Sequence, residues 1–252
     1  MAQKSDFLKK AHYIGAELSR MRNSPKITVL DETIAFPPVG DAWEGLLAIG
    51  GDLQEARLIA AYEHGAFPWY GENDPILWWA PEQRSLLFLD ELRVSKSMRN
   101  VLNRNPFELR IDGDFESVIR HCADVRENTE GTWISEDIIL AYVRLHQLGL
   151  AHSFECWQDN QLVGGLYGVS IGRMFFGESM FSIVNNASKV AFIHLVRWAK
   201  AHGFGPIDCQ ISNAHLVSLG AREVSRAEYM KILRSHLAAG KTLRQSWEDT
   251  LT

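Results

Sequence analysis

Two apolar runs of this chain carry acids and an amide, and that combination constrains the fold more than any other feature. Residues 175–182 read FFGESMFS, with Glu178 in the middle, and residues 207–211 read IDCQI. A carboxylate or an amide is costly to bury unless it is paired. Asp208 and Gln210 are two residues apart, so on a strand they share one face. We therefore expect a strand that presents a polar pair to a cleft.

The composition is that of a globular protein. The chain has 252 residues, of which 46% are hydrophobic and 23% charged, which suits one large domain or two modest ones. It has no run of about 18 or more apolar residues, and its first six residues, MAQKSD, lack the apolar core of a signal peptide. We expect a cytoplasmic protein that does not contact a membrane. The net charge of −5 argues against broad electrostatic binding to nucleic acid, so any RNA contact must be local.

The cysteines and histidines form no pattern typical of a metal site or a nucleophile. Cys122, Cys156 and Cys209 include no CxxC and no Cys/His cluster, so each is expected to be a small buried hydrophobe. The nine histidines, His146 and His152 among them, accompany no nucleophile elbow. We expect neither a metal nor a cofactor, and we leave the histidines out of the mechanism.

Helix and strand signals follow one another as in an α+β protein. A capping box, Asp52-x-x-Glu55, predicts a helix that ends near Gly65, and a second one, Ser225-x-x-Glu228, predicts a helix near the C-terminus. Apolar spacing predicts three further helices that begin at Asp114, Ser135 and Asn213, and a fourth over about residues 187–202. It also predicts strands at about residues 86–89, 153–157, 162–169, 173–176 and 207–211.

The order helix, helix, three strands, helix, strand is that of the acetyltransferase-like (GNAT-like) fold. Enzymes of that fold that use acyl-CoA bind its pyrophosphate with a glycine-rich turn. The equivalent turn here, residues 181–188, has no glycine, so we expect the fold without acyl-CoA as the donor. We expect a small N-terminal α/β domain at residues 1–83 and an acetyltransferase-like domain at residues 84–252. Residues 1–22 are expected to form a weak amphipathic helix or a flexible extension, and we assign them no function.

Five short motifs occur in a fixed order along the chain. They are FPW at residues 67–69, LWWAP at 77–81, GTWI at 131–134, GESMFS at 177–182 and DCQ at 208–210. Together they resemble the leucyl/phenylalanyl-tRNA–protein transferases, from about residue 31 to about residue 237. The resemblance implies an enzyme that takes Leu or Phe, with Met as a further candidate, from aminoacyl-tRNA. The acceptor would be the N-terminal Arg or Lys of a protein, which is thereby marked for degradation. We expect the enzyme to be a monomer.

The resemblance assigns the transfer step to Asp208 and Gln210. In the family this pair is proposed to act as a proton relay with the glutamine as base. Because an amide is a very weak base, we favour Gln210 as a group that orients the attacking amine through its side-chain oxygen, while Asp208 holds its NH₂. Asp208 would also stabilise the developing ammonium charge. The alternative is a polar pair at a strand end that satisfies nearby backbone.

The resemblance also implies a site for the transferred amino acid. Glu178 would hold its α-amino group, since a carboxylate and an ammonium can be desolvated together. Its side chain would be lined by Leu166, Phe175, Gly177, Met180, Leu195 and Ile207. Relatives often carry a bulkier aromatic near residues 195–199, where this chain has Leu195 and Ala199, so the preference among Leu, Phe and Met stays open. The alternatives are an ion pair for Glu178 and ordinary core for the apolar residues.

Aromatic and basic side chains are the expected contacts with tRNA. Trp69, Trp133 and Tyr142 match the positions that hold the 3′-terminal adenosine, and stacking of a base on an aromatic ring contributes roughly 1 to 3 kcal/mol. Candidates for contacts with the acceptor stem are Arg84, Arg93, Lys96, Arg99 and Arg104. The alternatives are core aromatics that tie two domains together and a solvated basic face.

Two other functions compete with aminoacyl transfer. One is an acyl-CoA N-acyltransferase of the same fold, which the missing glycine turn disfavours. The other is a non-catalytic RNA-binding adaptor that uses its tryptophans only for stacking. Transfer from aminoacyl-tRNA to a peptide that begins with Arg separates all three.

Overall fold

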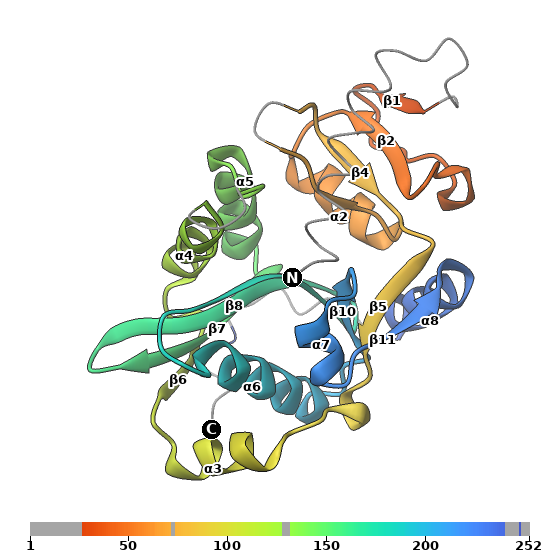
Figure 1. The fold of residues 1–252 in the computed structure, drawn as a ribbon. Helices are drawn as coiled ribbons and strands as arrows, with labels where there is room; N and C mark the ends of the chain where they lie inside the picture. Colours follow the sequence, from red (N-terminus) through yellow and green to blue (C-terminus); the bar gives the residue numbers. More distant parts are fainter. Residues whose placement is uncertain (1–26, 72–73, 128–131, 240–246, 248–252) are drawn as a thin grey trace.

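Two β-sheets organise the structure, a computed structural model that describes residues 27–71, 74–127, 132–239 and 247. The predicted extension at residues 1–22 lies outside the described residues. The first sheet ends at Trp79, and the second begins at Gln83 (Figure 1). The predicted domain boundary near residue 83 falls between the two sheets and stays a prediction.

The N-terminal sheet has four strands in the order β1-β2-β4-β3. They are β1 Thr28–Leu30, β2 Leu46–Gly50, β3 Phe67–Pro68 and β4 Leu77–Trp79. β4 pairs antiparallel with both β2 and β3, and its two tryptophans are fully buried. The indole N–H of Trp79 donates to the Trp69 carbonyl at 2.7 Å. This bond fixes the backbone of Trp69 directly after β3.

Helix α2, Glu55–Glu63, connects β2 to β3. The predicted capping box at its start is wrong, because the Asp52 carboxylate accepts the Gln54 N–H at 2.9 Å and an Arg57 guanidinium N–H at 3.3 Å instead of capping the helix. The predicted end is confirmed. Gly65 follows the helix with a φ of +85°, a left-handed conformation that glycine adopts without strain.

The second sheet has seven strands in the order β11-β5-β10-β9-β8-β7-β6. They are β5 Gln83–Leu87, β6 Glu108–Ile111, β7 Ala151–Gln158, β8 Gln161–Ile171, β9 Met174–Ser182, β10 Ile207–Gln210 and β11 Arg222–Ser225. β7, β8 and β9 form an antiparallel meander. β10 runs parallel to β9 and antiparallel to β5, so it joins the meander to the strand that follows the N-terminal sheet.

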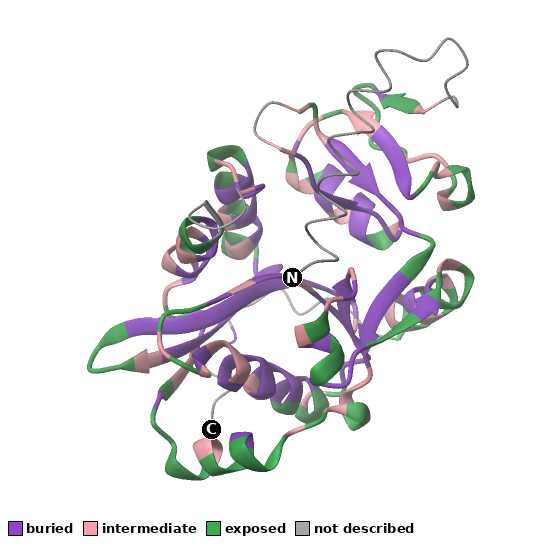
Figure 2. Cartoon of the chain, viewed as in Figure 1, coloured by how far each residue is buried: buried purple, intermediate pink, exposed green. Residues whose placement is uncertain are grey.

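Helices cover both faces of this sheet and enclose two hydrophobic cores (Figures 1 and 2). α4, Phe115–Glu127, and α5, Glu136–Gln147, pack on the face that also meets α2, whereas α6, Ala187–Ala201, packs on the other. The remaining helices are α3 Lys96–Arg104, α7 Ala214–Ser218 and α8 Arg226–Ala238, with 3-10 turns η1 Val39–Asp41 and η2 Leu89–Glu91. The predicted caps are confirmed: a backbone N–H three residues on donates to the side chain of Asp114, Ser135, Asn213 and Ser225.

The order α4, α5, β7-β8-β9, α6, β10 is the one predicted for the acetyltransferase-like fold. The α+β class is confirmed as well, and the N-terminal part of the chain has a sheet of its own. Strands β6 and β11, at the two edges of the large sheet, and helix α3 were not predicted. The consequence for function is that β9 and β10, the two strands predicted to carry polar groups, are direct neighbours at the centre of one sheet.

Trp247 fills the second core from the C-terminal end of the chain. It is fully buried and stacks on His152 and on Trp198, with ring centroids 3.5 Å and 4.0 Å apart. Its backbone N–H donates to the Asp112 carboxylate at 3.0 Å. The Trp247 ring also lies 6.2 Å from that of Phe175, so this aromatic cluster supports β9 from behind.

Candidate active site

A bulge in β10 sets the positions of Asp208 and Gln210. Asp208 pairs with Leu86 and Gln210 with Ser85, so the register shifts between them. Gln210 has a φ of +59°, a left-handed conformation that is strained for a residue with a side chain and is often found at functional sites. Its backbone N–H donates to the Asp208 Oδ1 at 2.8 Å. The simple alternation assumed from the sequence therefore does not hold at this point.

Asp208 lies in a fully buried ion pair with Arg84 of β5. The Arg84 Nε–H donates to Asp208 Oδ1 at 2.9 Å, and its Nη2–H donates to Oδ2 at 2.8 Å. The Tyr229 hydroxyl donates to Oδ2 at 2.7 Å. The Arg84 guanidinium lies over the rings of Phe67 and Tyr229, 4.6 and 4.7 Å from their centroids. Burial opposes the charge of Arg84, but the adjacent Asp208 outweighs it and raises the Arg84 pKa.

This ion pair overturns the prediction that Arg84 contacts the tRNA acceptor stem. The Arg84 side chain is 1% exposed, so it cannot reach a phosphate backbone in solvent. The charged residue inside the apolar strand segment QRSLLFL at residues 83–89 was a signal for a buried partner.

Glu178 of β9 is the second buried carboxylate, and three elements donate to it. Its Oε1 accepts the Tyr62 hydroxyl of α2 and the Gln210 Nε2–H of β10, both at 2.7 Å, and its Oε2 accepts the Tyr142 hydroxyl of α5 at 3.4 Å. The two tyrosine oxygens are 2.5 Å apart. Burial raises the Glu178 pKa to about 7, although the Tyr62 hydrogen bond opposes that rise.

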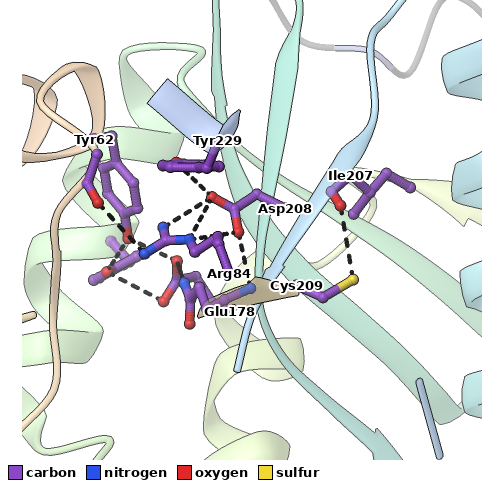
Figure 3. A network of polar contacts seen from close by, with 10 residues as sticks. Tyr62, Arg84, Glu178, Ile207, Asp208, Cys209 and Tyr229 are labelled. Atoms are coloured by element: carbon purple, nitrogen blue, oxygen red, sulfur yellow. Dashed lines mark hydrogen bonds and ion pairs between the residues drawn. The ribbon is translucent and has the colours of Figure 1, made fainter. Parts of the chain in front are cut away.

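The predicted bond between the Gln210 NH₂ and Asp208 is wrong, because that NH₂ binds Glu178 instead. Figure 3 shows Arg84, Asp208 and Tyr229 grouped beside the Tyr62–Glu178 contact. Asp208 contacts Gln210 through the backbone and Glu178 contacts it through the side chain. The two carboxylates thus belong to one connected cluster with Gln210 at the junction.

A narrow cleft opens beside this cluster. It is lined by Phe67, Pro68, Trp69, Trp133, Glu178, Gln210 and Ile211. The structure therefore brings together Trp69, Trp133, Glu178 and Gln210, which the sequence placed in the site. Tyr142 is fully buried and its hydroxyl donates to Glu178. Unlike the two tryptophans, it does not line the cleft.

Most of the residues predicted to line the donor side-chain pocket lie on the other face of the sheet. Four of the six belong to the core beneath α6, and Met180 packs against that core. Four of them, Leu166, Phe175, Leu195 and Ile207, are at most 2% exposed. Gly177 and Met180 are half-buried. A Cβ placed on Gly177 would have only the Asp208 carbonyl oxygen, at 3.6 Å, as a close neighbour, so there is open space at this point of β9.

The remaining basic candidates lie on or next to α3 and are exposed. They are Arg93, Lys96, Arg99 and Arg104. Arg93 and Arg99 line a cleft of about 660 Å³ between α3, the start of α6 and the end of α7, and Lys189 of α6 lines it too. Cations therefore converge on this cleft although the whole chain is acidic.

Tyr62 and Tyr229 were missed by sequence reasoning. Tyr62 lies in the last turns of α2, and Tyr229 lies near the start of α8. Neither position has a local signal beyond helical spacing, because their partners are 116 and 21 residues away along the chain.

Other chemistries find little support in the described part of the chain. No group of three or more His, Cys, Asp and Glu side chains there could hold a metal ion. Cys122, Cys156 and Cys209 are buried, as predicted. None of the described helices combines the length and the hydropathy needed to span a bilayer.

Comparisons with known proteins match most of the chain. Residues 86–234 match the family described as Leucyl/phenylalanyl-tRNA protein transferase, and residues 51–82 match its N-terminal domain. A protein of that name from Nitrosospira multiformis is 54% identical over 202 residues, which cover 79% of this chain and 87% of the relative. Those from Flavobacterium johnsoniae and Pseudomonas aeruginosa are each 53% identical, over 82% and 80% of this chain and 98% and 90% of theirs.

Solved structures with a related outline are much more distant. An aminoglycoside acetyltransferase from an uncultured soil metagenomic sample, in complex with trehalose, has a TM-score of 0.36 and 15% identity over 46% of this chain and 84% of its own. L-PGS from Bacillus licheniformis has a TM-score of 0.37 and 13% identity over 67% of this chain and 54% of its own.

Proposed function

Because this chain belongs to the leucyl/phenylalanyl-tRNA–protein transferase family, we propose that the cleft beside Glu178 and Gln210 is where it transfers the amino acid. The enzyme takes Leu or Phe from aminoacyl-tRNA and joins it by a peptide bond to the N-terminal Arg or Lys of an acceptor protein, which marks that protein for degradation. The observation that carries the site is the arrangement of two tryptophans, a carboxylate and an amide around one cleft. The tryptophan rings suit the adenine base of the tRNA, the carboxylate suits an amino group, and the amide suits the polar atoms of the reacting groups.

Trp69 and Trp133 hold the 3′-terminal adenosine in this proposal. Both rings line the cleft and are nearly buried, at 5% and 6% exposure. The cleft is narrow, so the side chains around it must shift when an adenine base enters. Stacking of the base on a tryptophan ring would contribute roughly 1 to 3 kcal/mol without reading the sequence. Tyr142 supports this end of the site indirectly, by its bond to Glu178.

Gln210 orients the attacking α-amine. Its NH₂ is engaged with Glu178 at 2.7 Å, which turns the amide oxygen away from that carboxylate and makes it available to accept an amine N–H. Correct orientation of the amine and the ester can contribute roughly 7 to 11 kcal/mol in favourable systems. Asp208 acts through Gln210: it holds the strained backbone and is itself held by Arg84. Because Asp208 is paired with Arg84 and does not line the cleft, it does not stabilise the ammonium charge directly, contrary to what was expected from the sequence.

The donor's α-amino group and side chain occupy the Glu178 end of the cleft. Glu178 offers a desolvated carboxylate for an ammonium group. β9 and β10 pair only at two positions, the later of which is Phe176–Asp208. The side chain of Leu, Phe or Met passes between the strands where they part, beside Gly177 and Met180, and reaches the core on the other face of the sheet, which holds Leu166, Phe175, Leu195 and Ile207. One methylene in such a pocket changes the binding free energy by only about 1 to 3 kcal/mol, which suits an enzyme that accepts more than one apolar residue.

The acceptor stem binds the basic cleft at α3. Arg93, Arg99 and Lys189 line this cleft, and Lys96 and Arg104 are exposed on α3. Phosphate contacts of this kind are local and salt-dependent, which fits a protein with a net charge of −5. We further propose that the enzyme is a cytoplasmic monomer.

One assay tests the function. The protein is mixed with a peptide that begins with Arg and with either labelled Phe-tRNA or labelled acetyl-CoA. We expect label to reach the peptide only from the tRNA. The same peptide with an acetylated N-terminus is the control and should stay unlabelled. Transfer from acetyl-CoA, or RNA binding without transfer, would contradict the proposal.

A further inference from the structure

The attacking amine needs a proton acceptor, and the cleft supplies few candidates. An N-terminal α-amine has a pKa of about 7.7 to 8.0, so most of it is ammonium at neutral pH and cannot attack an ester. Among the seven described residues that line the cleft, Glu178 is the only one with a titratable side chain. The other six are aromatic, aliphatic or amide.

Asp208 and Gln210 are poor alternatives as a base. The Asp208 carboxylate already accepts two bonds from Arg84, one from Tyr229 and one from the Gln210 backbone, and it does not line the cleft. The Gln210 side chain is an amide, which is almost non-basic in water. Gln210 can align the amine but cannot hold its proton.

We propose that Glu178 is the catalytic base that takes the proton from the attacking α-ammonium. This inference rests on the proposed function and gives Glu178 a task in addition to binding the donor's amino group. Gln210 donates to the same carboxylate, so one network aligns the amine and accepts its proton.

The surroundings of Glu178 suit a base that works near neutral pH. Burial raises its pKa to about 7, the Tyr62 bond and Arg84 oppose the rise, and the charge of Asp208 adds to it. Tyr142 is the remaining titratable group that faces it, from α5. A general base is most effective when its pKa lies near the operating pH, and such catalysis typically contributes 10²- to 10⁴-fold.

The proton balance is complete without a cofactor. The acceptor ammonium gives one proton to the Glu178 carboxylate, and the neutral nitrogen forms a bond to the ester carbonyl carbon. As the bond from that carbon to the ribose oxygen breaks, Glu178 returns its proton to the ribose oxygen and takes the second excess proton from nitrogen. The products are a peptide bond and a free adenosine hydroxyl, and Glu178 releases one proton to water when they leave.

The test uses a donor that lacks the α-amino group, tRNA charged with phenyllactate, beside Phe-tRNA and an Arg peptide. With the wild-type enzyme, kcat/KM for phenyllactyl transfer should rise with pH through about 7, as Glu178 becomes able to accept a proton, and level off above about 8, where the amine is already neutral. Glu178→Gln should lower kcat/KM at pH 7 by 10²- to 10⁴-fold, and its remaining activity should rise only as the free amine loses its proton, near pH 8. Glu63→Gln, on the exposed side of α2, is the matched control and should behave as wild type.

Three results would overturn the inference and are distinct from failure of the proposed function. The Glu178→Gln defect could appear with Phe-tRNA but vanish with phenyllactyl-tRNA, which would assign Glu178 to the donor's amino group. Phenyllactyl-tRNA could fail as a donor for the wild type while Phe-tRNA works, with the same meaning. The variant could also keep the wild-type pH profile. Absence of transfer from Phe-tRNA by the wild type would instead contradict the proposed function.

Discussion

Arg84 and Asp208 form an ion pair, 2.8 Å between Nη2 and Oδ2, in which both side chains are at most 1% exposed. It joins β5, the first strand after the N-terminal sheet, to β10, which carries Gln210. The Arg84 guanidinium also lies over Phe67 and donates to the Gly65 carbonyl at 3.4 Å, both in the segment that joins α2 to Trp69. The segment that joins α2 to Trp69 and the strand that carries Gln210 are thus held together through one cation.

Removal of that cation should destabilise the fold strongly. Arg84→Met leaves the Asp208 carboxylate buried without its counter-charge, and loss of one partner of a buried pair costs about 3 to 5 kcal/mol. Urea unfolding measures the change. Arg222→Met, which breaks the half-exposed pair with Glu91, is the control and should cost less than about 1 kcal/mol. Equal effects in the two variants would contradict this account of the pair.

Gln210 and Trp133 should separate turnover from tRNA binding. Gln210→Ala removes the group that orients the amine, so we expect kcat to fall with little change in the affinity for Phe-tRNA. Trp133→Ala should weaken that affinity about 5- to 150-fold, the equivalent of 1 to 3 kcal/mol of stacking, with a smaller change in kcat. Filter binding and single-turnover transfer measure the two quantities. Small and equal effects of both variants would count against the assigned roles.

Most of the large sheet could be predicted because its signals are local. Helical spacing and the caps at Asp114, Ser135 and Ser225 located three helices, and all three caps are present. β6 and β11 have four residues each and lie at the sheet edges, too short for alternation to stand out. The false capping box at Asp52 has a physical cause, since Arg57 and the Gln54 N–H bind its carboxylate.

The sequence was enough to predict which residues belong to the site, but not which residues they hydrogen-bond to. Glu178 and Gln210 were identified because polar groups in apolar runs need partners, yet the partners come from far along the chain. Tyr62 lies 116 residues from Glu178, and Arg84 lies 124 residues from Asp208. The β10 bulge rotates the Gln210 side chain toward Glu178, and strict alternation cannot foresee a bulge.

Tyr62→Phe should raise the pH at which the enzyme becomes active. The Tyr62 hydrogen bond lowers the Glu178 pKa, so its loss should raise that pKa further above 7. A hydrogen bond to a charged group contributes about 1.5 to 3 kcal/mol, which corresponds to a shift of roughly one to two pH units in the acidic limb of kcat/KM. Tyr70→Phe, at the start of the segment after Trp69, is the control. If Tyr62→Phe leaves the acidic limb of the kcat/KM profile at the same pH, the Tyr62 hydroxyl does not set the Glu178 pKa.

Glu178 should also make the fold less stable at alkaline than at acidic pH. Its pKa is about 7 in the folded protein and 4.5 as the ordinary value, so the folded state binds more protons between these values. Stability from this group is therefore complete below about pH 4.5 and is lost as pH rises through 7, by roughly 3 kcal/mol. Urea unfolding of wild type and Glu178→Gln should show the variant gaining stability relative to wild type between pH 5 and pH 8. A stability difference between the two proteins that does not vary with pH would contradict a raised pKa for Glu178.

Gly177→Ala should impair donor binding without unfolding the protein. A Cβ at this position meets only the Asp208 carbonyl oxygen at ordinary contact distance, 3.6 Å, so the unliganded fold accommodates it. Gly168, by contrast, faces the Phe176 carbonyl oxygen at 2.2 Å from its would-be Cβ, and Gly168→Ala should destabilise the sheet. If the donor side chain enters beside Gly177, the added methyl occupies space that the substrate needs, and KM for Phe-tRNA should rise more than KM for Leu-tRNA because the ring is wider. Unchanged KM values at unchanged stability would place the donor side chain elsewhere.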